Sequence, residues 1–112
     1  MTEKAFRNLL LEAVDSALSS LGDSARQAVY FHLEKKFDIA KDDIPRRIED
    51  FDQGLERIFG AGTRFLEVLI MKKLYEQMGT KRRTLKIDQA KEFKFPDYVR
   101  AAEQSFLRTK KS

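Results

Sequence analysis

Hydrophobic residues recur at spacings of three and four along the first 79 residues, the repeat expected of helices with one apolar face. The pattern predicts four amphipathic helices, over about residues 3–20, 23–37, 46–59 and 63–78. No defensible internal repeat relates them. The sequence therefore predicts an all-α fold with a small body resembling a four-helix bundle.

Turn-forming residues separate these helices. Gly22 is predicted to end the first helix, and Asp23-Ser24 to cap the second. In the connection 38–45, Ile39 and Ile44 are expected to attach the chain to the core. Between the third and fourth helices, glycines at 60 and 62 predict a tight turn. It is not a phosphate-binding loop, because no strand precedes it and no Gly-Lys-Ser/Thr follows.

The predicted helix 63–78 is the most apolar of the four. An apolar surface this wide belongs either at the centre of a bundle or at an oligomer interface. The residues proposed for such an interface are Phe65, Leu69, Met71, Leu74 and Tyr75. Glu67 interrupts the apolar run, and a buried ion pair with Arg57 or Arg64 would account for it.

Residues 80–112 are predicted to form a basic arm beyond a helical body of residues 1–79. Residues 80–88 form a basic linker, in which 84–87 could be extended. A short helix could follow at 88–93. Pro96 is expected to begin a final helix that ends near Arg108. The sequence leaves open whether this helix packs on its own body or crosses to a second chain.

The net charge of +4 is divided unevenly between the two parts. The body has twelve Lys and Arg against fourteen Asp and Glu, a net −2, whereas the basic arm has ten against four, a net +6. A basic segment of this kind can neutralise phosphates. The candidate nucleic-acid contacts are Lys81, Arg82, Arg83, Lys86, Arg100, Arg108, Lys110 and Lys111.

Aromatic residues near this cluster, Phe93, Phe95 and Tyr98, could stack on bases. The competing interpretation is that the segment is a solubilising linker whose aromatic residues dock the last helix on the body. This second interpretation is favoured over nucleic-acid binding, because an acidic body would repel a duplex lying across it.

Residues suited to catalysis or metal binding are few. The chain has no cysteine and one histidine, His32, whose spacing with Val29 and Leu33 places it on the apolar stripe of its helix. His32 is therefore expected to be a partly buried structural residue, although a phosphotransfer role is the competing hypothesis. The carboxylates are scattered over predicted helix surfaces, where Asp52 and Glu56 form an ordinary solvated face. No enzymatic activity, cofactor, metal or small-molecule substrate is expected.

Hydropathy argues against a membrane location. No segment approaches the roughly 20 apolar residues that a membrane-spanning helix needs, and the N-terminal residues form a charged amphipathic stretch. The expected location is the cytoplasm, with no membrane partner.

A series of short blocks in residues 21–78 resembles a known family. They are Leu21-Gly22-Asp23-Ser24, Val29-Tyr30-Phe31-His32-Leu33-Glu34, Ile44-Pro45, Phe51, Leu55-Glu56-Arg57-Ile58-Phe59-Gly60, and Leu66-Glu67 with Ile70. The resemblance is to an archaeal family of signal-transduction output domains named after Nitrosopumilus. It implies a cytoplasmic, non-catalytic archaeal module. The chain carries no receiver domain of its own, and the basic arm lies outside the matched stretch.

The sequence thus predicts a non-catalytic helical protein-interaction module of a regulatory kind, forming a homodimer or binding another protein. The alternative is a nucleic-acid-binding protein that uses the basic arm.

Overall fold

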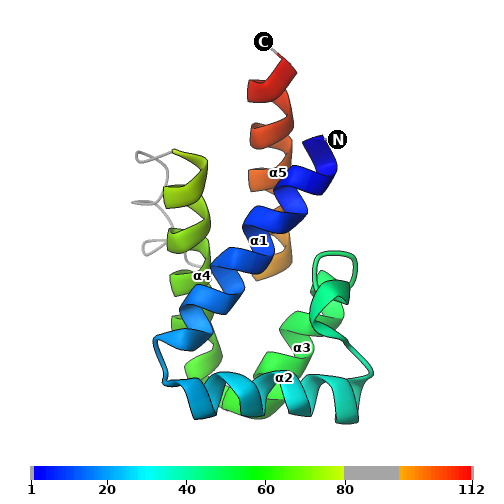
Figure 1. Cartoon of the computed structure of the whole chain (residues 1–112), viewed down its shortest axis with the longest axis vertical. Helices are drawn as coiled ribbons and strands as arrows, with labels where there is room; N and C mark the ends of the chain where they lie inside the picture. The colour runs from blue at the N-terminus through cyan, green and yellow to red at the C-terminus, as the bar shows by residue number, and fades with distance from the viewer. Residues whose placement is uncertain (1, 80–93, 112) are drawn as a thin grey trace.

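The computed structural model describes residues 2–79 and 94–111, and every regular element in these two ranges is a helix (Figure 1). The all-α prediction is confirmed. The helices are α1 (Thr2–Ser19), α2 (Asp23–Phe37), α3 (Ile48–Phe59), α4 (Thr63–Met78) and α5 (Phe95–Lys111). The predicted linker, extended stretch and short helix over 80–93 lie outside the described residues.

The first helix is the centre of the packing. α1 packs most extensively on α4 and also contacts α2 and α5. Figure 1 shows α1 crossing in front of α4 and α5, with α2 lying across the end where α1 finishes. The rings of Phe6 and Phe106 are 5.8 Å apart, so the first and last helices lie side by side. These contacts join segments that are far apart in the sequence.

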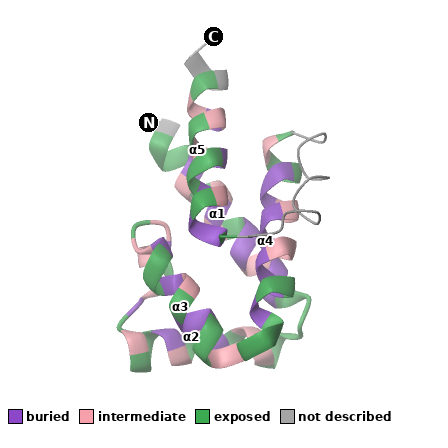
Figure 2. Ribbon diagram, turned by 180° about the vertical axis from the view of Figure 1, so that it is seen from behind, coloured by how far each residue is buried: buried purple, intermediate pink, exposed green. Residues whose placement is uncertain are grey.

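All five helices contribute to a single hydrophobic core, and buried and exposed positions alternate around them (Figure 2). The largest fully buried aromatic side chains are Phe6, Phe51 and Phe95. Phe51 of α3 and Phe95 of α5 have ring centroids 6.1 Å apart. The apolar face of α5 thus completes the core formed by the preceding helices of the same chain.

The corner between α1 and α2 differs from the predicted one. Gly22, at φ 108°, is the residue that precedes α2, and it makes no side-chain cap. A φ this far into the positive range is readily accessible to glycine, which has no Cβ. Asp23 is already helical, and its carboxylate accepts hydrogen bonds from Arg26 at 2.8 Å and Gln27 at 3.1 Å. The predicted Asp23-Ser24 cap is therefore wrong, because this carboxylate bonds side chains rather than backbone N–H groups.

The connection between α2 and α3 is attached to the core as predicted. Ile39 and Ile44 are fully buried on either side of a single 3₁₀ turn, Lys41–Asp43. The turn Gly60–Gly62 between α3 and α4 is also a short 3₁₀ turn, which confirms the predicted break there.

A polar cluster around Asp15 holds α1 against α2. The carboxylate of Asp15 lies 3.1 Å from Arg26, 3.0 Å from the Tyr30 hydroxyl and 3.6 Å from Lys41. Burial raises the pKa of Asp15, but the hydrogen bond from Tyr30 and the charges of Lys41 and Arg26 outweigh it. The pKa of this carboxyl therefore lies below its ordinary value.

Helices α2 and α3 approach closely at Gly54, where an added Cβ would lie 2.8 Å from a methyl carbon of the buried Leu33. We expect Gly54→Leu to lower the free energy of unfolding by about 2–3 kcal/mol, because extra carbon atoms would overpack this contact. Denaturant unfolding measures the loss. Gly62→Leu is the control, since nothing lies within 4 Å of the added Cβ there. Equal stability of the two variants would contradict the close approach.

Candidate functional site

The outer face of α4 consists of Arg64, Phe65, Val68, Leu69 and Lys72, which line a groove of about 680 Å³. Phe65 is 77% exposed, more than any other large hydrophobic residue among those described. Val68 and Leu69 are half-buried beside it. Because an exposed phenylalanine next to an apolar groove leaves hydrocarbon in water, this face could stabilise a contact with another molecule.

The opposite side of α4 belongs to the core. Met71, Leu74 and Tyr75 were candidates for the oligomer interface, but all three are buried within the chain. The prediction is wrong for these residues, because their side chains already pack on other helices and offer no free surface. The other two residues proposed for the interface, Phe65 and Leu69, do lie on the outer face of α4.

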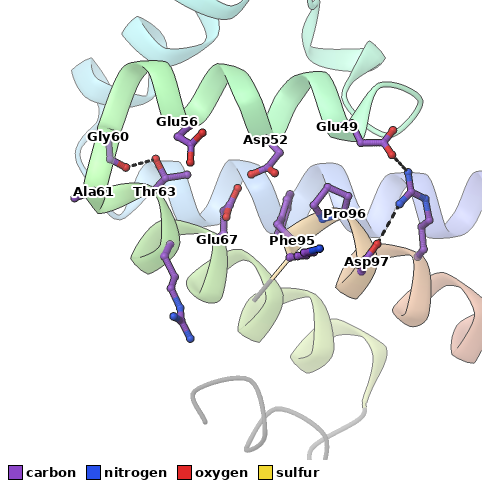
Figure 3. A pocket seen from close by; sticks show the side chains of 13 residues that line it. Glu49, Asp52, Glu56, Gly60, Ala61, Thr63, Glu67, Phe95, Pro96 and Asp97 are labelled. Carbon is purple, nitrogen blue, oxygen red and sulfur yellow. Dashed lines mark hydrogen bonds and ion pairs between the residues drawn. The ribbon is translucent and has the colours of Figure 1, made fainter. Parts of the chain in front are cut away.

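A second concave surface, the acidic cleft, lies between α3, α4 and the start of α5 (Figure 3). Its volume is about 470 Å³. The lining combines carboxylates, a few cationic side chains and apolar surface: Glu49, Asp52, Glu56, Gly60, Ala61, Thr63, Arg64, Glu67, Lys94, Phe95, Pro96, Asp97 and Arg100.

The walls of the acidic cleft are positioned by ordinary helix geometry. Asp52 and Glu56 are four residues apart on α3 and therefore lie on the same side of that helix. The Thr63 hydroxyl lies 2.7 Å from the Gly60 carbonyl oxygen and 3.2 Å from that of Leu55, which ties the start of α4 to the end of α3. The geometry thus places the first turn of α4 directly opposite the acidic side of α3.

Glu67 is the most unusual residue of the acidic cleft. It is only 5% exposed, and its Oε2 atom has no hydrogen-bond partner among the described residues. Figure 3 shows its carboxyl group directed toward Asp52 and Glu56. Burial is the main cause that raises the pKa of Glu67 to about 9, helped by hydrogen bonding to Asp52 and by the charges of Asp52 and Glu56. Glu67 is therefore protonated at neutral pH.

The predicted buried ion pair of Glu67 with Arg57 or Arg64 is wrong. The charged groups that shift the pKa of Glu67 are carboxylates on α3, not arginines. Asp52 is half-buried and Glu56 is exposed, in keeping with the predicted solvated face, but both also line the acidic cleft and act on Glu67. That second role was not predicted. Their four-residue spacing was visible, but nothing in the sequence showed that α4 would direct a third carboxyl group at them.

The candidate nucleic-acid contacts are only partly within the described structure. Arg100 is exposed on α5, where it pairs with Glu49 of α3 and with Asp97 at 3.5 Å. Arg108 is exposed farther along the same helix. Lys81, Arg82, Arg83 and Lys86, and the side chains of Lys110 and Lys111, lie outside the described residues. A nucleic-acid interface stays a prediction.

His32 is half-buried on α2, as expected, and its ring meets that of Phe31 edge-on at 6.0 Å. In the described ranges, no three His, Cys, Asp or Glu side chains are grouped so that they could hold a metal ion. None of the helices described here has the length and apolar character needed to cross a membrane.

In comparisons with known proteins, the chain matches no protein-family model, no curated protein and no solved structure. The resemblance of residues 21–78 to the archaeal output-domain family stays a prediction.

Proposed function

We propose that this protein is a non-catalytic helical interaction module that pairs with a second copy of itself through the outer face of α4. The observation that carries the proposal is the exposed Phe65 beside the groove formed with Val68 and Leu69. In a pair, the outer face of α4 in each copy would cover Phe65 of the other and remove both rings from water.

The charges on α4 favour an antiparallel pair. Arg64 stands near the start of the outer face, and the exposed Glu76 extends the same side toward the end of the helix. They are about 18 Å apart along the helix axis. A two-fold axis between them would bring Arg64 of one copy to Glu76 of the other, and the reverse. A guanidinium has five donors, so Arg64 can add this contact to those it makes within its own chain.

The proposed pair is tested by sedimentation equilibrium on wild type and Phe65→Ala. We expect the wild type to dimerise. Phe65→Ala should weaken the dimer by at least about 30-fold, because truncating a central aromatic residue of an interface costs about 2 kcal/mol or more. Phe31→Ala is the matched control: Phe31 is 57% exposed on α2, away from α4, and its loss should leave the dimer intact.

A charge exchange tests the antiparallel arrangement. Arg64→Glu and Glu76→Arg should each weaken the dimer, whereas the double variant should recover affinity because the opposite charges again face each other. A monomeric wild type, or a dimer that Phe65→Ala leaves unchanged, would remove the proposal.

The regulatory part of the proposal is supported by the resemblance of residues 21–78 to archaeal signal-output domains, which implies a cytoplasmic setting. In such a regulatory role, dimerisation would present two copies of a partner-binding surface. Loss of output by Phe65→Ala, in cells where the protein stays folded, would link the pair to regulation.

A further inference from the structure

The acidic cleft contains a buried acceptor that the fold itself does not use. Glu67 is more than nine-tenths buried, yet within residues 2–79 and 94–111 its Oε2 atom has no hydrogen-bond partner. A buried polar atom left unpaired destabilises the fold, so folded proteins rarely retain one without a reason. The dimer proposed above gives no reason, because the outer face of α4 lies on a different side of the helix.

We propose that the acidic cleft binds an organic cation, a protonated amine carried on a short aliphatic chain. The ammonium group would lie between Glu67, Asp52 and Glu56, where it could donate its three hydrogens. The aliphatic chain would lie along Phe95 and Pro96, which form the apolar side of the same cleft. The volume of about 470 Å³ is within the range of small-ligand sites.

The composition of the cleft favours an ammonium over other ligands. Anions are disfavoured, because the carboxyl group of Glu67 is directed toward those of Asp52 and Glu56 in this part of the cleft. A metal ion is disfavoured too, since the described acidic residues are not grouped closely enough to coordinate one. An ammonium requires looser geometry than a metal ion and hydrogen-bonds each carboxylate separately.

The Arg100 side chain does not occupy this part of the cleft. Arg100 is engaged by Glu49 and Asp97 at the other end, as Figure 3 shows. Charged groups from three parts of the chain line the cleft around Glu67. Helix α3 contributes Glu49, Asp52 and Glu56, and α4 contributes Arg64. The last part contributes Lys94, just before α5, and Asp97 and Arg100 within it. Asp52 and Glu56 are the two whose charges act on the Glu67 carboxyl.

Binding should be coupled to proton release. With the cleft empty, Glu67 holds its proton at neutral pH, because ionisation would place a negative charge on a buried carboxyl group beside the carboxylates of Asp52 and Glu56. An ammonium supplies the missing positive charge, so Glu67 loses its proton to solvent as the ligand enters. Affinity should then rise with pH, up to about tenfold per pH unit below the pKa of Glu67.

The test is an NMR and calorimetric titration of the full chain with n-butylammonium. Nα-acetyl-lysine amide is the second probe, because the same ammonium could come from a free amine or from a lysine side chain. Saturable binding of n-butylammonium would identify a free amine as sufficient. Saturable binding of the lysine probe alone would assign the site to a protein side chain. Both results support the proposal. n-Butanol, which has a similar shape and no charge, should not bind.

Two variants separate a binding site from general electrostatic attraction. Glu67→Gln should weaken binding of the probe by about tenfold or more and abolish its pH dependence, because an amide can neither ionise nor pair with a cation. Glu12→Gln removes an exposed carboxylate elsewhere and should leave binding unchanged. The proposal is overturned if neither probe shows saturable binding, if Glu67→Gln binds as tightly as wild type, or if wild-type affinity does not change with pH.

Discussion

Replacing Phe95 by alanine is expected to lower the free energy of unfolding by about 3–5 kcal/mol, the usual cost of removing a fully buried phenylalanine. Phe95 is 1% exposed at the start of α5, and its ring lies against Phe51 of α3. The substitution would leave a cavity between α3 and α5. Urea or guanidinium unfolding followed by far-ultraviolet circular dichroism measures the loss.

The control for Phe95→Ala is Phe31→Ala, which removes the same number of atoms from an exposed ring on α2. That ring meets His32 edge-on and lies 5.8 Å from the Lys35 ammonium. Its loss should cost less than about 1 kcal/mol. If the two variants were equally stable, α5 would not be an integral part of the core, and the last helix would be better described as a detachable arm.

Glu67→Gln is expected to stabilise the protein, by an amount that grows as pH rises. In the unfolded chain Glu67 ionises near its ordinary value of 4.5, whereas in the folded chain its pKa is about 9. Between these values the folded state holds a proton that the unfolded state has lost. Wild-type stability therefore falls with rising pH across this interval, by at most about 1.4 kcal/mol per pH unit.

The measurement is the denaturant midpoint of wild type and Glu67→Gln from pH 5 to pH 8. The two curves should diverge steadily, because glutamine preserves the shape of the side chain but does not ionise. Glu12→Gln, on the exposed side of α1, should give a curve parallel to wild type. Parallel curves for wild type and Glu67→Gln would mean that Glu67 ionises normally in the folded protein.

The helices could be predicted because each has a local cause that the sequence displays. The helix predicted over 63–78 matches α4 at both ends, since glycines border it on either side. The connection 38–45 was also predictable, because Ile39 and Ile44 are isolated apolar residues in a polar stretch. The cap of α2 was missed, because Asp23 has a side chain suited to capping but uses it on Arg26 and Gln27.

The outer face of α4 and the acidic cleft depend on how the helices pack against one another, and this packing cannot be read from the sequence. Both sides of α4 are apolar, so Phe65 on the outer face and Leu74 in the core could not be told apart by hydropathy. Glu67 could be recognised from the sequence as an unusual residue, because it places a carboxyl group inside an apolar run. Its neighbours could not be predicted, since Asp52 and Glu56 look like ordinary solvent-facing residues and only the packing of the helices brings them close to Glu67.

The contact between α1 and α5 has a consequence for synthesis of the chain. Phe6 is synthesised long before Phe106, yet their ring centroids lie 5.8 Å apart. Until α5 is available, the nascent chain would expose part of the apolar face of α1 to water. Folding therefore cannot be completed progressively from the N-terminus during translation. We expect the final step to be the docking of α5, so a ribosome-bound chain that lacks this helix should be the form most readily recognised by chaperones.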